Sequence, residues 1–321
     1  IAETLDDAGA KAQYDGHVKR ILGSRQVLAR ILKGAVAEYK DYSPEEIEAW
    51  IEPGIEIANT SLRPGEKENK VLLITGDNTE SKVPGEGTVT YDIRFRAYVP
   101  KRRRAETVKL LVNIEAQKKF YQKYRIVTRG IFYGARMLSE QLDREFTDAE
   151  YDDLKKVCSI WICMNAPAHI GNAMTEYRIS RRNILGRIPE RKASYDKLSV
   201  VIICLNEKDD KNQRGGLHGF LNTLLSPSMS VTEKEEILAR DYGIVMEQEM
   251  GEELRQMCNL SEAIEEKGIE KGIEKGIEEG IEKGINLTKK VLRYVREGRN
   301  NEEIAELCGI TIEQVHEITE D

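Results

Sequence analysis

The segments TVTYDIRF (88–95) and KLLVNIEAQ (109–117) decide the fold of this chain. Apolar and polar residues alternate in both segments with a period of two, which predicts two β-strands. Side chains two positions apart in a strand share a face, so Glu115 and Gln117 point the same way. If the two strands pair, we expect Asp92 to join them on that face of a sheet.

Two carboxylates and an amide on one face form a set of hard oxygen ligands, and such a set suits Mg²⁺. The same residues also have a purely structural interpretation. Asp92 can form ion pairs with Arg94 and Arg96 on an exposed face, and Glu115 can pair with a nearby lysine. Gln117 can be an ordinary polar position on a solvated strand, so the spacing alone leaves both alternatives open.

The residues around this pattern carry a more specific signal. Together with the flanking QKKFYQKYRIVTRGIFYGARMLSEQL (117–142), the Asp and Glu-x-Gln pattern resembles the PD-(D/E)XK nuclease superfamily. Within it, the chain resembles the PD-(D/E)XK nuclease family transposases, the recombination-promoting nuclease/putative transposase group. The resemblance covers roughly residues 14–225. It implies an α/β fold with a restriction-endonuclease-like αβββαβ core, a mixed sheet and a C-terminal helical extension.

The resemblance also implies a site and its chemistry. Asp92, Glu115 and Gln117 would be catalytic, and Asp92 and Glu115 would hold Mg²⁺, for which Mn²⁺ can substitute. The third position is a lysine in the wider superfamily, whereas Gln117 can carry no charge and only orients water or phosphate by hydrogen bonding. Lys119 returns to the same face if the strand continues and is a candidate substitute cation. Glu86 is an auxiliary metal-ligand candidate, although turn chemistry also explains an acidic residue there.

The net charge of -7 conceals a strong asymmetry along the chain. Residues 247–284 carry twelve Glu against five Lys and Arg, whereas residues 101–129 carry ten Lys and Arg against two Glu. Residues 178–192 carry six basic side chains against one Glu. Basic clusters beside a carboxylate site favour a DNA substrate. The DNA phosphate contacts expected at one loop tip are Lys101, Arg102, Arg103 and Arg104, although a solvated loop explains these charges equally well.

Periodicity and composition also predict the organisation of the 321 residues. We expect a nuclease-like domain over 1–225, a helical connector over 226–264, a repeat helix over 265–285 and a small helical hairpin over 286–321. Within the first domain, the expected helices and strands are helix Tyr14–Tyr39, strand 70–75, helix Tyr121–Leu142 and strands 159–164 and 198–205. On the first helix, Asp15 and Lys19 lie one turn apart and can form a surface ion pair.

The sequence EEKGIEKGIEKGIEEGIEKGI (265–285) repeats every four residues, so its Ile and Gly stripes spiral slowly around a helix. A solvated spacer and a homo-oligomer interface both fit this pattern. After it, Ala305, Gly309 and Val315 match the spacing of a helix-turn-helix. The second helix of that motif would contain no Lys or Arg, so a packing hairpin is the better interpretation.

No apolar run approaches the ~20 residues of a membrane span, and the first residues resemble no signal peptide. Five scattered Cys without zinc-type spacing indicate reduced thiols, and we therefore expect a cytoplasmic protein without a membrane partner. The expected function is that of a Mg²⁺-dependent DNA endonuclease associated with recombination or mobile elements. The alternative is a catalytically weak nucleic-acid-binding or interaction protein that retains the nuclease fold.

Overall fold

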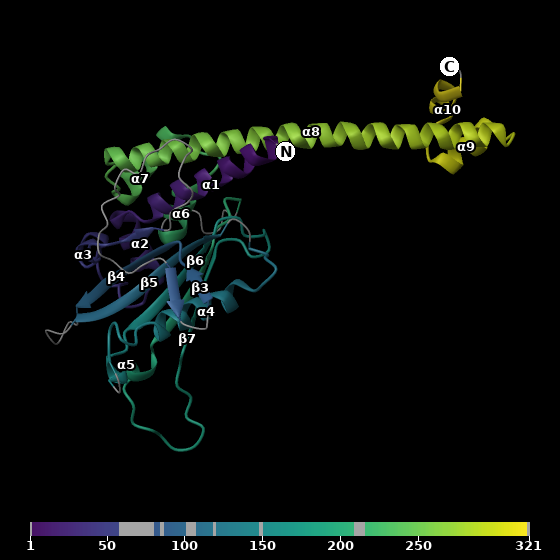
Figure 1. The fold of residues 1–321 in the computed structure, drawn as a ribbon. Coiled ribbons are helices and arrows are strands. Elements are labelled where there is room, and N and C mark those ends of the chain that lie inside the picture. Colours follow the sequence, from purple (N-terminus) through teal and green to yellow (C-terminus); the bar gives the residue numbers. More distant parts are fainter. Residues whose placement is uncertain are drawn as a thin grey trace. The chain divides into compact units, whose positions relative to one another are not determined.

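The computed structural model contains two compact units, Ile1–Ser261 and Glu262–Asp321 (Figure 1). The residues that the structure describes are 2–57, 80–83, 87–100, 107–117, 120–147, 150–208 and 216–319. The first unit thus includes most of the segment 226–264 that the sequence predicted as a connector. In that segment, Leu238, Met250 and Leu254 are buried.

A mixed sheet forms the centre of the first unit, and its described strands follow the order β1-β4-β5-β6-β8-β7. The strands of this sheet are β1 (Glu56–Ile57), β4 (Ile93–Pro100), β5 (Thr107–Gln117), β6 (Lys156–Cys163), β7 (Ala173–Arg178) and β8 (Leu198–Cys204). β5, β6 and β8 run parallel, whereas β4 and β7 pair antiparallel with their neighbours. The predicted α/β class with a mixed sheet is confirmed.

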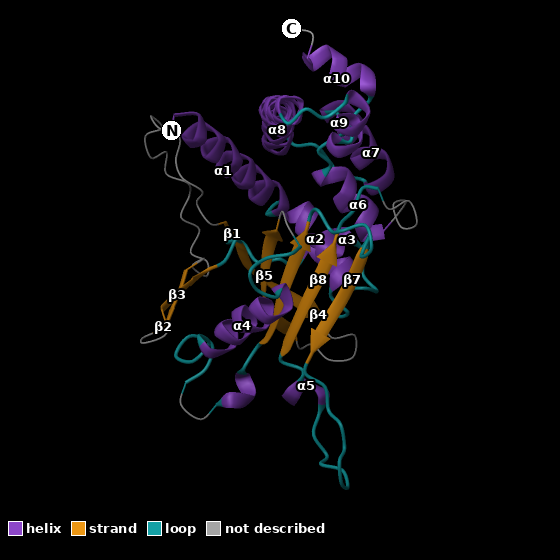
Figure 2. Cartoon of the chain, turned by 90° about the vertical axis from the view of Figure 1, so that its right-hand side faces the viewer, coloured by secondary structure: helices purple, strands orange, loops and turns teal. Residues whose placement is uncertain are grey.

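One face of the sheet is covered by α4 (Ile126–Ser139), which connects the parallel strands β5 and β6 (Figure 2). A parallel pair requires such a crossover, and a helix is the usual solution. The helix packs closely because two glycines face the sheet. A Cβ on Gly130 would lie 2.6 Å from Val200 Cγ1 and 2.9 Å from Trp161 Nε1. This close approach brings the first turns of α4 over the carboxyl ends of the parallel strands.

Helices also cover the other face of the sheet. Moving away from this face, α2 and α6 come first, then α1, and then the first turns of α8 (Figure 1). Apart from α4 and α8, the described helices of the first unit are α1 (Ala2–Leu22), α2 (Arg25–Ala35), α3 (Pro44–Ala49), α5 (Lys192–Tyr195), α6 (Gly216–Leu225) and α7 (Val231–Tyr242), with a 3₁₀ turn at Tyr151–Asp153. The single helix predicted over Tyr14–Tyr39 is wrong. It breaks after Leu22 because the Ser24 side chain caps α2 by accepting a hydrogen bond from the Val27 N–H (3.4 Å).

The predicted strand TVTYDIRF is also divided. β3 ends at Thr90 and pairs with β2 (Glu80–Val83), whereas β4 begins at Ile93 and belongs to the main sheet. Asp92 therefore lies in a bend between two strands and not within one. The strand expected over 70–75 lies outside the described residues. β7 was not anticipated, because it is an edge strand whose side chains are almost all exposed and show no alternation.

In the second unit, α8 (Gln248–Arg296), which begins in the first unit, is helical throughout the four-residue repeat. The isoleucines of the repeat are half exposed, from 50% at Ile285 to 59% at Ile273. The helices α9 (Asn301–Cys308) and α10 (Ile312–Thr319) form a hairpin around the buried Ala305 and Val315. Gly309 supplies the turn with a φ of +68°. None of the described helices combines the length and apolarity needed to cross a membrane.

Candidate active site

Two carboxylates meet at the open end of the β4–β5 hairpin. The last paired residues of this antiparallel ladder are Ile93 and Ile114, so Asp92 and Glu115 are directly opposed one position further on. The Asp92 N–H donates to Glu115 Oε1 (3.1 Å). In return, the Ala116 N–H donates to Asp92 Oδ2 (3.0 Å). These two backbone hydrogen bonds fix both carboxylates against the end of β5.

A lysine from a distant part of the sequence forms an ion pair with one of these carboxylates. Lys19 on α1 lies with its Nζ 2.8 Å from Asp92 Oδ1 and 2.8 Å from Asp15 Oδ2. The ion pair between Lys19 and Asp15 is therefore present, but Lys19 is buried rather than on the helix surface. Burial lowers the pKa of Lys19, but the two carboxylates outweigh it and the net pKa is raised. Lys19 is a fixed positive charge in the site.

Glu115 is buried to 2% exposure, which makes its charge the most costly in the site. Burial, and then the neighbouring Asp92 carboxylate, raise the pKa of Glu115 well above its usual range. Hydrogen bonds from the Asp92 N–H and from Asn113 Nδ2 (3.3 Å), together with the charge of Arg129, act in the opposite direction. An additional cation beside Glu115 would stabilise its ionised form.

Arg129 on the first turns of α4 is held by aromatic rings. Its guanidinium carbon lies over the rings of Tyr133 (4.9 Å), Tyr124 (5.0 Å) and Trp161 (5.5 Å). It donates hydrogen bonds to the hydroxyls of Tyr124 and of Tyr133 (2.5 Å). These contacts orient a positive charge toward the Glu115 side of the sheet. The sequence analysis missed Arg129, although it lies within the basic segment 101–129.

The polar positions next to Glu115 on this face of β5 are Asn113 and Gln117. Asn113 is fully buried, and its Oδ1 has no hydrogen-bond partner in the part of the chain that the structure describes. Gln117 is half-buried at the carboxyl end of β5, and its backbone oxygen accepts a hydrogen bond from the Met164 N–H (2.9 Å). The Gln117 side chain is therefore placed at the edge where the two carboxylates lie.

The alternative interpretation of Asp92 as an ion-pair partner of the β4 arginines is wrong. Arg94 pairs with the buried Glu140 just beyond α4, and Arg96 pairs with Glu145 (2.8 Å). Several other predicted site residues lie outside the described residues, namely Glu86, Lys119, Lys101, Arg102, Arg103 and Arg104.

The donor set fits a hard divalent cation in its chemistry. Asp92 and Glu115 provide carboxylate oxygens at one point, and Asn113 Oδ1 is a buried oxygen without a donor among the described residues. Mg²⁺ is usually held by one or two carboxylates and retains several waters, so two carboxylates suffice. No group of three or more His, Cys, Asp or Glu side chains suited to a metal occurs among the described residues. Asp92 and Glu115 are therefore the two acidic side chains that could hold such a cation at this point of the fold.

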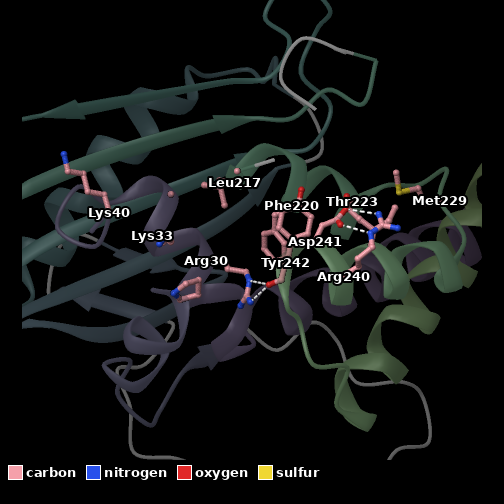
Figure 3. Close-up of a pocket in the computed structure, with 14 residues that line it drawn as sticks. Arg30, Lys33, Lys40, Leu217, Phe220, Thr223, Met229, Arg240, Asp241 and Tyr242 are labelled. Atoms are coloured by element: carbon pink, nitrogen blue, oxygen red, sulfur yellow. Dashed lines mark hydrogen bonds and ion pairs between the residues drawn. The ribbon is translucent and has the colours of Figure 1, made fainter. Parts of the chain in front are cut away.

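A large cavity of about 1,020 Å³ lies elsewhere, next to α2, α6 and α7 (Figure 3). Three of its basic lining residues, Arg30, Lys33 and Arg240, have partners within the chain. Arg30 donates to the backbone oxygen of Tyr242, and Arg240 pairs with Asp241 (2.7 Å). Neither Asp92 nor Glu115 lines this cavity, so its size does not locate the carboxylate pair.

Comparison of the chain with known protein families, curated proteins and solved structures finds no match.

Proposed function

We propose that this chain is a Mg²⁺-dependent DNA endonuclease of the PD-(D/E)XK type, associated with recombination or mobile elements. The observation that carries the proposal is the opposition of Asp92 and Glu115 at the end of β5, with the ammonium of Lys19 on Asp92. The order of elements supports it, since α1, β4, β5, α4 and β6 occur in the order of the helices and later strands of an αβββαβ core, with α2, α3 and the short strands β1, β2 and β3 between α1 and β4. The assignment of a restriction-endonuclease-like fold is part of this proposal.

Hydrolysis of a phosphodiester needs an activated water and neutralisation of the charge that develops on the phosphate. A divalent cation held by Asp92 and Glu115 supplies both, by lowering the pKa of a bound water and by acting as a Lewis acid. The chain's own residues supply the remainder. Glu115 is held rigidly by two hydrogen bonds, and Gln117 at the strand end can orient the water or a phosphate oxygen.

Lys19 provides the positive charge that the Glu-x-Gln pattern lacks. In the superfamily, the residue at the position of Gln117 is a lysine, and its ammonium can neutralise developing charge. Here an ammonium from α1 contacts one of the two carboxylates, with its Nζ 2.8 Å from Asp92. A strand that ends in Glu-x-Gln is therefore compatible with a complete catalytic set.

The same contact also favours the second candidate function, a nucleic-acid-binding protein with little or no catalysis. A lysine on Asp92 already compensates one carboxylate charge without a metal. Such a protein would bind DNA through its basic segments and would not need Mg²⁺.

Nicking of supercoiled plasmid DNA by the purified protein tests the proposal. We expect nicking with Mg²⁺ or Mn²⁺, none in EDTA, and a fall to the EDTA background for Asp92→Asn and Glu115→Gln. Glu236→Gln, which removes an exposed carboxylate on α7, is the matched control and should cut at the wild-type rate. DNA binding without cleavage by the folded wild-type protein would reject the enzyme in favour of the binding protein.

A further inference from the structure

A second cavity, of about 680 Å³, lies at the carboxyl edge of the parallel strands. Its floor is formed by the ends of β8 and β7, including Ile202 and Thr175, and its wall by residues 120–127 ahead of and within the first turn of α4. The volume falls within the roughly 300–1,000 Å³ of small-molecule sites. In open α/β sheets, ligands bind at this edge, outside the carboxyl ends of the strands.

Three of the exposed residues that line this cavity are tyrosines. Tyr121 is 59% exposed, Tyr177 is 43% exposed and Tyr124 is 42% exposed. Tyr121 forms an edge contact with Phe120, with ring centroids 5.2 Å apart, so the tyrosine is braced rather than loose. The Tyr121 ring also stacks on His169, with centroids 6.3 Å apart, and Arg129 lies over the Tyr124 ring, so each of these two rings has only its other face left for a ligand. Planar rings of a ligand stack on such aromatic faces.

The positive charge of the residues that line the cavity favours an anionic ligand. Lys123 and Arg125 line it and are exposed, and no Asp or Glu is among the described residues that line it. Aromatic rings interleaved with basic side chains are the combination that binds unpaired nucleic-acid strands, because bases stack while the cations hold the backbone. A flat apolar ligand without charge would leave these cations without a role.

The strand register places this cavity within reach of the carboxylates. Glu115 pairs with Trp161 on β6, and Trp161 pairs with Ile202 on β8, so Glu115 and Ile202 share one row of the sheet. Neighbouring strands lie about 4.8 Å apart, so two strand spacings separate the two positions by roughly 10 Å. Tyr124 links the two places, since its ring lines the cavity and its hydroxyl accepts a hydrogen bond from Arg129.

We infer that this cavity seats an unpaired nucleobase of the DNA strand whose backbone lies at Asp92 and Glu115. The base site rests on the cavity alone. The position of the backbone at Asp92 and Glu115 rests on the proposed function. A base that is still paired within a duplex presents only its edge and cannot enter between the tyrosines. The substrate class is therefore single-stranded DNA, or duplex DNA with an extruded or mismatched base.

Equilibrium binding of a fluorescein-labelled single-stranded oligonucleotide to the full chain in EDTA tests the inference without any cleavage. The comparison ligand has the same sugar-phosphate backbone with abasic positions in place of bases. We expect the complete strand to bind about 5- to 150-fold more tightly for each base that stacks. Tyr177→Ala and Tyr121→Ala should reduce that difference, whereas Tyr177→Phe and Tyr121→Phe should retain it.

Tyr151→Ala is the matched control, because Tyr151 is 67% exposed and precedes the amino end of β6, the opposite edge of the sheet. Equal affinity for the two ligands, or base-dependent binding that survives both alanine variants, would overturn the inference. The binding result is independent of plasmid nicking. Base-dependent binding by a protein that never cuts DNA would reject the proposed endonuclease but retain the base site. Cutting without base-dependent binding would reject the base site alone.

Discussion

The ammonium of Lys19 lies 2.8 Å from Oδ1 of Asp92, although one residue comes from α1 and the other from the bend that precedes β4. This contact joins the first helix to the carboxylate pair, so the site depends on the packing of α1 as well as on the sheet. Because Asp15 contacts the same ammonium at 2.8 Å, the lysine is shared between two acids.

Removal of this ammonium tests its role in catalysis and its role in the stability of the fold. We expect Lys19→Met to lower the nicking rate about 10²-fold, as the loss of one charge-stabilising donor does. The free energy of unfolding should fall by about 2 kcal/mol, because hydrogen bonds to charged groups are lost. Lys11→Met on the exposed side of α1 is the matched control and should change neither quantity. Initial nicking rates and urea unfolding curves measure the two effects.

A second substitution distinguishes a catalytic charge from a structural one. If the site needs an ammonium, Gln117→Lys in the Lys19→Met protein restores it at the position used by the wider superfamily. We expect this double variant to recover at least part of the nicking rate while its stability stays low. A double variant that folds but nicks no faster than Lys19→Met would limit Lys19 to holding α1 in place.

Replacing a glycine by alanine should lower stability in α4 and raise it in the repeat of α8. Gly130→Ala forces a Cβ to within 2.6 Å of Val200 and displaces α4 next to Arg129, so we expect a loss of about 1–3 kcal/mol in stability. Gly272→Ala in the repeat meets no atom within 4 Å and should stabilise that helix by about 1 kcal/mol. Thermal unfolding followed by circular dichroism measures both. Equal effects of the two substitutions would contradict the packing described for α4.

Acid should loosen the contact between α1 and the start of α8. Burial raises the pKa of Glu253, but hydrogen bonds from His17 (2.5 Å) and Arg20 outweigh it, so the net pKa is lowered. A carboxyl whose pKa is lower in the folded state stabilises above its unfolded pKa of about 4.3, and that stability disappears as pH falls through the folded value. We therefore expect the melting temperatures of wild type and Glu253→Gln to differ at pH 6 and to converge as the pH falls below the folded-state pKa of Glu253. A constant difference across that range would exclude this linkage.

The features that local sequence patterns encode are the ones that sequence analysis predicted. Glu115 lies in the part of its strand where apolar and polar residues alternate, from Val112 to Gln117, and Asp92 is close enough in sequence for a hairpin to bring the two together. The carboxyl ends of β6 and β8 were within one residue of expectation, because their apolar runs are long and continuous. The α/β class followed from the same strands.

The features that sequence analysis missed depend on distant contacts or on single side-chain bonds. Lys19 fits a surface pair with Asp15 by its spacing, and only the packing of α1 reveals that it reaches Asp92. The apolar periodicity continues through the break at Ser24, because a cap leaves no mark in the hydrophobic pattern. β7 has an exposed edge and therefore no alternation to detect.

The position of the two carboxylates within the β4–β5 hairpin also has a consequence for how the chain folds. The pair Pro100 and Thr107 adjoins the connection between the strands, whereas Ile93 and Ile114 form the last rung at the open end. Loop closure favours pairing that starts near the connection, since short loops lose less entropy than long ones. We expect the rungs to form in that order, so Asp92 and Glu115 approach each other only after all the other rungs have closed. Their mutual repulsion would then act on the final rung and not on the nucleus, so Glu115→Gln should slow unfolding more than it speeds folding. Neutralising Asp92 would also remove its ion pair with Lys19 and should not slow unfolding in this way.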